Sequence, residues 1–595
     1  MCGLTGFCDF KKELERRALA AANKNLCHRG PDFNADVLIE TPNANIGLAH
    51  TRLSILDLSA NGNQPFYSKD GEIAIIYNGE IYNFREIRKE LESRSHSFFS
   101  TSDTEVIIHA YEEWGLEAVS RFNGMFAFAL LDQEKQMLYL FRDRAGVKPL
   151  YYSYIDDRLV FASELKSLVT YPGFERKICQ AAVMLFFKYG YIRSPYSIFE
   201  NTFKVPPGHY IALDINTKKL DTIKYYDVLD QYNQPKLILT EQEALDETEA
   251  LMTSAFQYRT ISDVPVGIFL SGGYDSTLVT ALLQRSNTTK LKTFTIGFHE
   301  DSYNEAPHAK KIAAYLGTDH HELYCTATDA QNILNTLPGI YDEPLGDSSM
   351  IPTLLVSKLA RSLCAVSLSA DGGDELFAGY ERYPNLQKLC RLQGKNTEAG
   401  YRKLAAEDVT YFSDEELNRL LPGFNTSIGL YDDIGSIGPE NDLINTCLAL
   451  DYKTYMVDDI LAKVDRATMS VGLESREPFL DHRLVEFVAR LPSELKYHAG
   501  EKKYLLKKIT HKYIPQELMD RPKAGFTIPL HQWLKKEFRE HLFEYITEEK
   551  LRAHGLIDPA TALALRDDFL NGKHGNHIQL WFLLMFQMWH GRWGK

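Results

Sequence analysis

The 595-residue sequence lacks the features that mark several protein classes. It has only eight cysteines and neither a CxxC pair nor a Cys/His zinc spacing, which argues against a disulfide-stapled domain and a zinc finger. Its first residues lack the basic and apolar regions of a signal peptide. The longest apolar stretches, Met125–Leu131 and Ile578–Trp589, are too short to cross a bilayer. These absences predict a soluble, reduced, cytoplasmic protein that does not act on membranes.

Positive charge is also scarce, because 66 lysines and arginines face 80 acidic residues, for a net charge of −14. Affinity for a nucleic-acid backbone is built largely from Lys and Arg, so the balance predicts no nucleic-acid partner. Hydrophobic residues at 44% and charged residues at 25% are ordinary globular values. The length is too great for one hydrophobic core and predicts two to four domains.

The pattern of the first two hundred residues is typical of short strands joined by turns. The β-branched run Ile73–Tyr77 precedes Asn78-Gly79, a dipeptide that predicts a hairpin turn. Further strands are predicted over Met125–Leu131, Met137–Phe141 and Leu159–Phe161, and helices over Phe84–Arg94 and Thr104–Glu113, the second with Asp103 as N-cap. This mixture predicts an α+β domain of stacked antiparallel sheets.

The texture changes after Pro206-Pro207-Gly208. A polar segment, 209–240, is predicted as a linker between a first domain at 2–208 and a second at 241–595. Strands and helices then alternate over Val264–Leu270, Ser276–Gln284, Lys292–Phe298, Glu305–Leu316 and Ala365–Ser369. Such alternation predicts a parallel, doubly wound α/β sheet, followed by a mostly helical C-terminal part.

A glycine-rich loop follows the first of these strands. Ser271-Gly272-Gly273-Tyr274-Asp275-Ser276 lies between buried Leu270 and a predicted helix. Glycines let backbone N–H groups converge on an anion, and a helix N-terminus favours negative charge. The loop lacks the Lys and the longer spacing of a Walker A motif. It resembles the pyrophosphate loop of the N-type ATP pyrophosphatases, in which a carboxylate attacks the α-phosphate of ATP to give an acyl-AMP and pyrophosphate.

A second loop, after the strand Ala365–Ser369, contains Asp371, two glycines and Asp374. Parallel sheets bind ligands beyond the carboxyl ends of their strands, so both loops are expected at one edge. Carboxylates are the ligands that Mg²⁺ prefers. We therefore predict that Asp275 and Asp374 share one magnesium ion.

Cys2 directly follows the initiator methionine. Removal of Met1 leaves a cysteine whose free α-amine can act as general base for its own thiol. An incidental cysteine at this position is the simpler reading of Met-Cys alone, and the rest of the domain argues against that reading.

Five segments, the first of which begins at Cys2, occur in the order seen in class II glutamine amidotransferases: Cys2-Gly3-Leu4-Thr5-Gly6, His28-Arg29-Gly30-Pro31-Asp32, His50-Thr51-Arg52-Leu53-Ser54-Ile55, Tyr77-Asn78-Gly79-Glu80-Ile81-Tyr82-Asn83 and Ser102-Asp103-Thr104-Glu105. With the pyrophosphate loop downstream, the whole chain resembles the glutamine-hydrolysing asparagine synthetases. The resemblance implies an Ntn-hydrolase αββα sandwich followed by an ATP pyrophosphatase domain.

The resemblance also implies roles in glutamine hydrolysis. It makes Cys2 the nucleophile and Asn78 and Gly79 the oxyanion hole. The remaining positions bind the glutamine: Arg52 takes its α-carboxylate, Leu53 to Ile55 line the pocket, and Glu80 and Asp103 take its ammonium group. His28 is expected to be structural.

In the second domain the resemblance implies that ATP contacts Leu270, Ser271, Gly272, Gly273, Asp275, Ser276, Ile296, Ser369 and Ala370. Asp371 would support the acyl-adenylate chemistry. Arg521-Pro522-Lys523-Ala524-Gly525-Phe526 matches the stretch with the family's catalytic lysine, so Lys523 would stabilise charge on the α-phosphate. Val464–Met469 and Ser475–Asp481 are expected to pack at the domain junction, and an internal tunnel for ammonia is expected between the sites.

The predicted activity is amidation of a carboxylate with nitrogen from glutamine, using ATP and Mg²⁺, and aspartate is the default acceptor. Residues 342–349 and 369–374 depart from some asparagine synthetases, which leaves a uronic acid on a sugar nucleotide as the alternative. An inactive regulatory paralogue conflicts with the intact motifs. A tRNA-modifying enzyme conflicts with the acidic charge. A homodimer is common among similar proteins.

Overall fold

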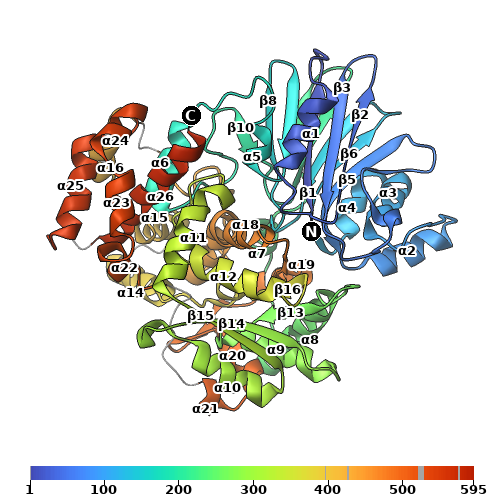
Figure 1. Cartoon of the computed structure of the whole chain (residues 1–595). Helices are drawn as coiled ribbons and strands as arrows, with labels where there is room; N and C mark the ends of the chain where they lie inside the picture. Colours follow the sequence, from blue (N-terminus) through green and yellow to red (C-terminus); the bar gives the residue numbers. More distant parts are fainter. Residues whose placement is uncertain (1, 395–396, 425–427, 520–527, 574–575, 595) are drawn as a thin grey trace.

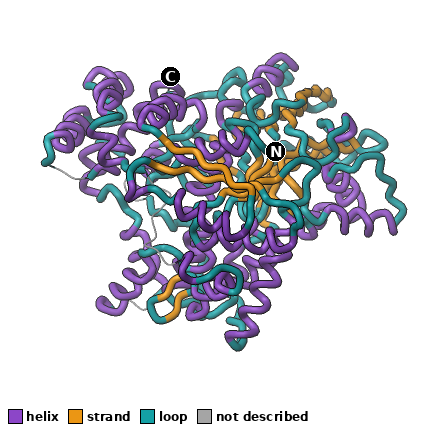
Figure 2. The backbone as a smooth tube through the Cα atoms, turned by 60° about the horizontal axis from the view of Figure 1, so that its bottom comes forward, coloured by secondary structure: helices purple, strands orange, loops and turns teal. Residues whose placement is uncertain are grey.

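The computed structural model describes residues 2–394, 397–424, 428–519, 528–573 and 576–594. Two sheets of antiparallel strands form the N-terminal part, and a parallel sheet with helices forms the rest (Figure 1). In Figure 2 helices surround the strands in the middle of the molecule. The predicted stretch that contains Lys523 lies outside the described residues.

The N-terminal part is a sandwich of two six-stranded antiparallel sheets. The first has the order β10-β8-β9-β1-β3-β2 and the second β12-β11-β7-β6-β5-β4. Their strands are β1 (Gly3–Asp9), β2 (Phe33–Glu40), β3 (Asn45–Arg52), β4 (Phe66–Tyr67), β5 (Ile73–Ile81), β6 (Gly124–Asp132), β7 (Met137–Arg142), β8 (Tyr151–Ile155), β9 (Arg158–Ala162), β10 (Thr202–Lys204), β11 (His209–Asp214) and β12 (Leu220–Lys224).

Helices cover both outer faces of this sandwich. Helix α1 (Arg16–Lys24) packs on the first sheet, and α2 (Phe84–Ser93) and α3 (Asp103–Trp114) pack on the second. Leucine, isoleucine and alanine side chains such as Leu4, Ile76 and Leu140 fill the space between the sheets. This arrangement confirms the predicted αββα sandwich. Successive side chains of a strand point to opposite faces, so each sheet turns one set of side chains toward the other sheet.

Two local predictions were wrong. Asn78-Gly79 forms no turn, since β5 runs through both residues and pairs with β6 along its whole length. A Cβ atom at Gly79 would lie 2.2 Å from the carbonyl oxygen of Met125, so the glycine permits close approach of strands. The N-cap of α3 is Ser102, whose side chain accepts a hydrogen bond from Thr104, and Asp103 is the first residue of the helix.

The segment predicted as a linker also needs correction. Strands β11 and β12 lie within 209–240, and β11 pairs with β7, so the N-terminal sandwich continues to Lys224. Polar residues on an edge strand made this segment look like a loop, because β12 has only half-buried and exposed positions.

The second half contains a five-stranded parallel sheet in the order β15-β14-β13-β16-β17, as predicted from the strand-helix alternation. Its strands are β13 (Val266–Phe269), β14 (Lys292–Phe298), β15 (Asp319–Cys325), β16 (Val366–Leu368) and β17 (Glu474–Arg476). The strand order reverses between β13 and β16, which is the switch point where such sheets bind ligands. Helices α9 (Tyr274–Ser286), α10 (Ala306–Leu316) and α12 (Met350–Arg361) connect the strands.

The C-terminal part is helical and returns to the N-terminal part. Helix α26 (His577–Trp593) lies beside α6 (Gln180–Tyr189), where Phe586 contacts Phe186 and Phe187 (Figure 1). The two halves are therefore joined by an apolar contact as well as by the junction near the sites. Among the described residues, no helix combines the length and apolarity that a membrane span requires.

Candidate active sites and their junction

Cys2 directly precedes β1 and is buried, with 8% of its surface exposed. Its backbone N–H donates to Oδ1 of Asn78 at 2.9 Å, which fixes the start of β1 against β5. Burial raises the pKa of the Cys2 thiol, and the backbone N–H of Leu53 and the Arg52 guanidinium partly offset that rise. A thiol held neutral in this way needs a base to become a nucleophile.

Asn78 offers a donor beside this thiol. Its Nδ2 is buried and has no hydrogen-bond partner within the described part of the chain, although its Oδ1 is bound to Cys2. An unpaired buried donor costs free energy unless a ligand satisfies it. The Asn78 amide is therefore positioned to bind an oxygen that develops negative charge next to Cys2.

Arg52 lies at the end of β3, and its guanidinium is hydrogen-bonded within the protein. The two η nitrogens donate to the carbonyls of Leu56, Asp57 and Ser59 and to Oδ1 of Asn63. These four contacts match the four Nη hydrogens, so two-pronged binding of a glutamine carboxylate would require the 56–63 loop to release some of them. The guanidinium shapes this loop in the structure.

The two predicted ammonium-binding acids, Glu80 on β5 and Asp103 at the start of α3, lie close enough for the Asp103 charge to raise the pKa of Glu80. Asp103 accepts hydrogen bonds from the Tyr77 hydroxyl at 2.8 Å and the Ile81 backbone at 2.9 Å, and burial raises its pKa. Glu80 forms an ion pair with Arg476 at 3.2 Å, and burial raises its pKa further than the Arg476 charge lowers it. Arg476 belongs to the second half of the chain, so both halves contribute to the surroundings of Glu80.

The loop with Leu53 and Ile55, which is predicted to line the glutamine pocket, packs against the parallel sheet. Leu53 and Ile55 pack against Val366 and the neighbouring residues of β13. The backbone N–H of Asp263 donates to the carbonyl of Ile55 at 3.0 Å, and Asp57 N–H donates to the Asp263 carboxylate at 2.9 Å. The loop that lines the glutamine pocket is thus held by the strand that leads into the pyrophosphate loop.

The predicted pyrophosphate loop follows β13 at the switch point. Ser271 and Ser276 hydroxyls lie 3.0 Å apart, and the Ser271 hydroxyl accepts from Gly273 N–H at 3.2 Å. Gly272 has a positive φ of 79°, which a side chain would strain, and helix α9 begins at Tyr274 without a side-chain cap. The N-terminus of a helix favours a negatively charged group, so this loop and helix start suit a phosphate.

The second acidic loop meets the first across the switch point. Helix α13 (Gly373–Phe377) starts beside Asp275, since a Cβ at Gly373 would lie 2.7 Å from the Asp275 carboxylate. Lys503 bridges the two predicted metal ligands, with its ammonium on Asp275 and at 2.7 Å from Asp374. Both carboxylates therefore reach one cation, so the residues fit a magnesium ion that would neutralise the phosphates of ATP.

Lys503 is a residue that sequence reasoning missed. It is buried at the start of α20 (Tyr504–His511) in a left-handed conformation with φ of 55°. Asp275 and Asp374 raise its pKa against the lowering effect of burial. Only its neighbour Lys502 and the following helix mark it in the sequence, and a pair of lysines is more often a solvated surface feature.

The other nucleotide positions surround the same edge. Leu270 and Ile296 are buried at the ends of β13 and β14. Ser369 follows β16, donates to Asp371 at 2.5 Å and binds the carbonyl of Arg476 through its backbone N–H. Ala370 is half-buried in the same turn.

The space beside Asp371 is acidic. Burial raises the pKa of the Asp371 carboxyl, and Lys463 lowers it in part. Lys463 is itself paired with Asp347 at 2.7 Å and lies close to Asp459, whose pKa burial and Asp347 raise well above its usual range. Three carboxyl groups thus surround one buried lysine next to the predicted adenylate site.

A buried ion cluster joins the two halves next to Cys2. Arg29 donates from Nε to the carbonyl of Cys2 at 3.0 Å and binds Asp465 with both η nitrogens, at 2.8 and 2.9 Å. Glu164 accepts from Arg29 at 2.6 Å and lies 3.1 Å from the His28 ring, which fits the structural role predicted for His28. The junction role predicted for Val464–Met469 rests on this Asp465 contact.

Strand β17 forms the wall between the two sites. Glu474 lies close enough to affect the pKa of Cys2, whereas Glu477, three residues later, interacts with Asp371. Burial raises the pKa of Glu477 to about 7, and its Oε2 has no hydrogen-bond partner in the described part of the chain. Lys148 of the N-terminal part donates to the carbonyl of Ser475 at 3.3 Å.

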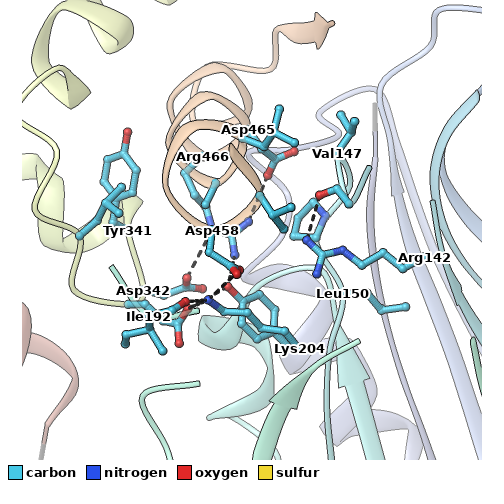
Figure 3. A pocket seen from close by; sticks show the side chains of 18 residues that line it. Arg142, Val147, Leu150, Ile192, Lys204, Tyr341, Asp342, Asp458, Asp465 and Arg466 are labelled. Carbon is cyan, nitrogen blue, oxygen red and sulfur yellow. Dashed lines mark hydrogen bonds and ion pairs between the residues drawn. The ribbon is translucent and has the colours of Figure 1, made fainter. Parts of the chain in front are cut away.

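An interior cavity lies at this junction. Figure 3 shows side chains from both halves turned toward one another around it, with Lys204 between Asp458 at 3.3 Å and Glu343 at 3.2 Å. Asp465 and Arg466 of α18 (Ala462–Met469) form its wall near Arg29. Lys463, on the same helix, reaches the acidic space beside Asp371.

Sequence comparisons agree with these two sites. Residues 247–591 match the asparagine synthase family, and residues 1–226 match the glutamine amidotransferase domain. Asparagine synthetase (glutamine-hydrolysing) 1 of Bacillus subtilis is 33% identical over 99% of this chain and 96% of its own length. The chain belongs to the asparagine synthase family. It is therefore a glutamine-hydrolysing ligase of that family, with an Ntn-type first domain.

Other members of the family differ in their names. A putative asparagine synthetase 2 of Methanocaldococcus jannaschii is 39% identical over 65% of this chain and 76% of its own length. The amidase chyE of Penicillium rubens is 28% identical over 94% of this chain and 93% of its own length. Family membership therefore leaves the acceptor carboxylate open.

Proposed function

We propose that the protein transfers the amide nitrogen of glutamine to a carboxylate that it activates with ATP. One observation carries the proposal. Buried Cys2 is bonded to Asn78, whose Nδ2 remains unsatisfied, and Arg29 and Asp465 connect Cys2 to the domain with the predicted pyrophosphate loop. Aspartate is the first candidate acceptor, because curated relatives of similar length are named asparagine synthetases.

The glutamine half-reaction is assigned to the first pocket. The α-amine of Cys2, once Met1 is removed, takes the thiol proton, and sulfur attacks the glutamine amide. Asn78 Nδ2 and the Gly79 backbone bind the oxyanion. Collapse releases ammonia and leaves a thioester, which water hydrolyses to glutamate. Leu53, Ile55 and Asp103 orient the substrate, while Arg52 and Glu80 must first exchange part of their present contacts.

The ATP half-reaction is assigned to the switch point of the parallel sheet. The acceptor carboxylate attacks the α-phosphate, which gives an acyl-AMP and pyrophosphate, and ammonia then displaces AMP to form the amide. The Ser271–Ser276 loop binds the pyrophosphate. The nucleotide contacts Leu270, Ile296, Ser369 and Ala370. Asp371 and Lys523 act at the reacting phosphate. Magnesium, held by Asp275 and Asp374, would supply charge neutralisation of the phosphates.

Ammonia must reach the second site without meeting bulk water, where it is mostly protonated. The cavity in Figure 3 supports a passage through the junction, because α18 carries Asp465 on the Cys2 side and Lys463 on the acceptor side.

A second class of acceptor has its own support. Lys463, which lies close to Asp371, is already paired with Asp347, and Asp459 adds a further carboxyl group. Such a lining favours an acceptor that offers hydroxyl donors, as a uronic acid on a sugar nucleotide does, over one with a second free carboxylate.

A panel of acceptors tests the proposal. Protein, glutamine, ATP and Mg²⁺ are incubated with aspartate, free uronic acids and nucleotide-linked uronic acids, and AMP and amide are followed. Amide and AMP in equal amounts with one acceptor are expected. Absence of AMP with every acceptor would refute the activity, and AMP with uronic acids alone would replace aspartate.

A further inference from the structure

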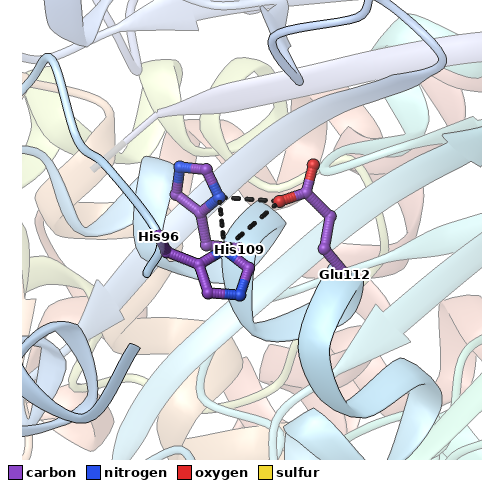
Figure 4. A group of neighbouring side chains, drawn as sticks. All are labelled: His96, His109 and Glu112. Atoms are coloured by element: carbon purple, nitrogen blue, oxygen red, sulfur yellow. Dashed lines mark hydrogen bonds and ion pairs between the residues drawn. The ribbon is translucent and has the colours of Figure 1, made fainter. Parts of the chain in front are cut away.

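One group of histidine and acidic side chains in the described chain converges as metal ligands do, and none of its members takes part in the proposed reactions. His96 lies in the connection between α2 and α3, and His109 and Glu112 lie one turn apart on α3. Figure 4 shows the two imidazole rings and the carboxylate turned toward one another. The side chains of His96 and His109 are 16% and 12% exposed, so one side of the group faces solvent.

The three converging atoms form a compact triangle. Nδ1 of His96 and Nδ1 of His109 are 3.2 Å apart, and Oε2 of Glu112 lies 2.7 Å from the second and 3.7 Å from the first. A tetrahedral ion with bonds of about 2.0–2.1 Å places its ligand atoms roughly 3.3–3.4 Å from one another. The three observed distances, 2.7, 3.2 and 3.7 Å, lie on both sides of that ligand–ligand distance.

Within the triangle, hydrogen bonding depends on one proton. A carboxylate oxygen only accepts, so the Nδ1 of His109 must donate to Glu112. The Nδ1 of His96 can accept from the same N–H, because its own ring can hold its hydrogen on Nε2 toward Glu113 at 3.1 Å. A metal ion in place of that proton would take one lone pair from each of the three atoms.

The distal ring nitrogens are also arranged as in metal sites. Nε2 of His96 contacts the Glu113 carboxylate at 3.1 Å, and Nε2 of His109 lies 3.8 Å from Glu105. Carboxylates on the far nitrogen fix the tautomer of a metal-binding histidine and raise its basicity. Both rings therefore have the outer partner that such a ligand needs.

We propose that His96, His109 and Glu112 bind one divalent transition-metal ion, with zinc preferred, which fastens the α2–α3 connection to α3. Two imidazoles and one carboxylate suit Zn²⁺, and water completes its fourth position on the exposed side. The connection is otherwise anchored by Glu105, which accepts from the backbone of Phe99 at 2.9 Å and of Ser100 at 2.8 Å. The ion would add a second anchor just before Asp103.

The test is metal binding to the full-length protein. The chain is stripped with a chelator and titrated with Zn²⁺ by calorimetry, with excess Mg²⁺ present to occupy the carboxylates of the ATP site. Wild type is expected to bind one Zn²⁺ at this site, with a four-coordinate spectrum for Co²⁺ and a higher Tm when loaded. His109→Gln and His96→Asn should remove that binding step, and Glu113→Gln should weaken it about tenfold or more.

His541→Asn is the matched control, because His541 lies on α23 (Arg539–Tyr545) and contacts Asn335 rather than this group. It should keep the Zn²⁺ site. Circular dichroism of each metal-free variant checks the fold, and Glu112→Gln offers a milder change if a histidine variant unfolds. Equal Zn²⁺ binding by wild type and all three ligand variants, or no saturable binding by wild type, would overturn the proposal.

Discussion

The two candidate active sites of this chain are built in different ways. The candidate glutaminase site is built on strands, because Arg52 and Asn78 lie on β3 and β5 of the sandwich and Cys2 directly precedes β1. The synthetase site lies on loops that leave the parallel sheet at β13 and β16. A strand-built site is fixed by its ladder of backbone hydrogen bonds, whereas a loop-built site can exchange partners when a ligand arrives.

The contacts of the reactive groups reflect this difference. Asn78 keeps an unsatisfied donor ready beside Cys2 without any ligand. Asp275 and Asp374 instead share the ammonium of Lys503. We infer that the Asn78 donor of the first site is preorganised, and that the second site becomes competent only when Mg²⁺ and ATP replace the Lys503 ammonium.

Replacement of the nucleophile should separate the two sites most strongly. Cys2→Ala is expected to lower glutamine-dependent amidation by at least about 10³-fold, because the thioester cannot form. Ammonia-dependent amidation should continue, since the ATP site is untouched. Cys8→Ala, a buried cysteine of the same strand, is the control and should retain glutamine use. Glutamine-dependent activity in Cys2→Ala would remove Cys2 from its proposed role.

The unsatisfied amide gives the next largest effect. Asn78→Asp keeps an acceptor for the Cys2 backbone N–H but replaces the free donor by an oxygen. Removal of one oxyanion donor typically lowers kcat about 10²–10³-fold, and that loss is expected for glutamine hydrolysis alone. Steady-state rates with glutamine and with ammonia measure it. A similar loss in both assays would mean that Asn78 acts on folding rather than on the oxyanion.

Removal of the internal cation should affect only the loop-built site. Lys503→Gln removes the ammonium that lies between two close carboxylates and should destabilise the metal-free protein by about 1–3 kcal/mol. Thermal unfolding with and without Mg²⁺ measures the effect, and Mg²⁺ should restore more Tm in the variant than in wild type. Lys502→Gln is the neighbouring control, because its partner Glu381 is exposed. An equal Mg²⁺ response in all three proteins would contradict the exchange of cations.

Glu477, which follows the strand between the two sites, should give an effect that appears only as a pH dependence of stability. Burial raises the pKa of Glu477 to about 7. Its stabilising contribution is therefore present in full below its ordinary pKa and is lost as pH rises through about 7. Glu477→Gln should match wild type near pH 5 and be more stable by up to about 3 kcal/mol near pH 8. Tm values across this range are compared with exposed Glu494→Gln, and parallel curves for wild type and Glu477→Gln would contradict the shift.

Much of both folds could be predicted from periodicity. The run Lys292–Phe298 is β14 at the same limits, and the alternation after it predicted the parallel sheet. The motifs likewise brought Cys2, Asn78 and Arg52 to one pocket, and Asp275 and Asp374 to one cation. Local rules work here because buried strands and glycine-rich turns use short-range patterns.

The errors arose where tertiary packing overrode a local signal. Asn78-Gly79 has the composition of a hairpin turn, yet Gly79 serves the close approach of β6. Lys503 gave no signal of its function, and the junction predicted for the segments with Asp465 and Arg476 did not identify their partners. Each of the three acts on a residue far away in sequence: Asp275, Arg29 and Glu80. Spacing along the chain cannot reveal such pairs.

The central claim is that one chain couples the two sites, and isotope transfer tests it most directly. Glutamine labelled with ¹⁵N in its amide is supplied with ATP, Mg²⁺, the acceptor found in the panel and an excess of unlabelled ammonium. The account predicts an amide product that carries mainly ¹⁵N, with one AMP for each amide formed. Product that carries the unlabelled nitrogen of the bulk ammonium, or glutamate released with neither AMP nor amide, would contradict it.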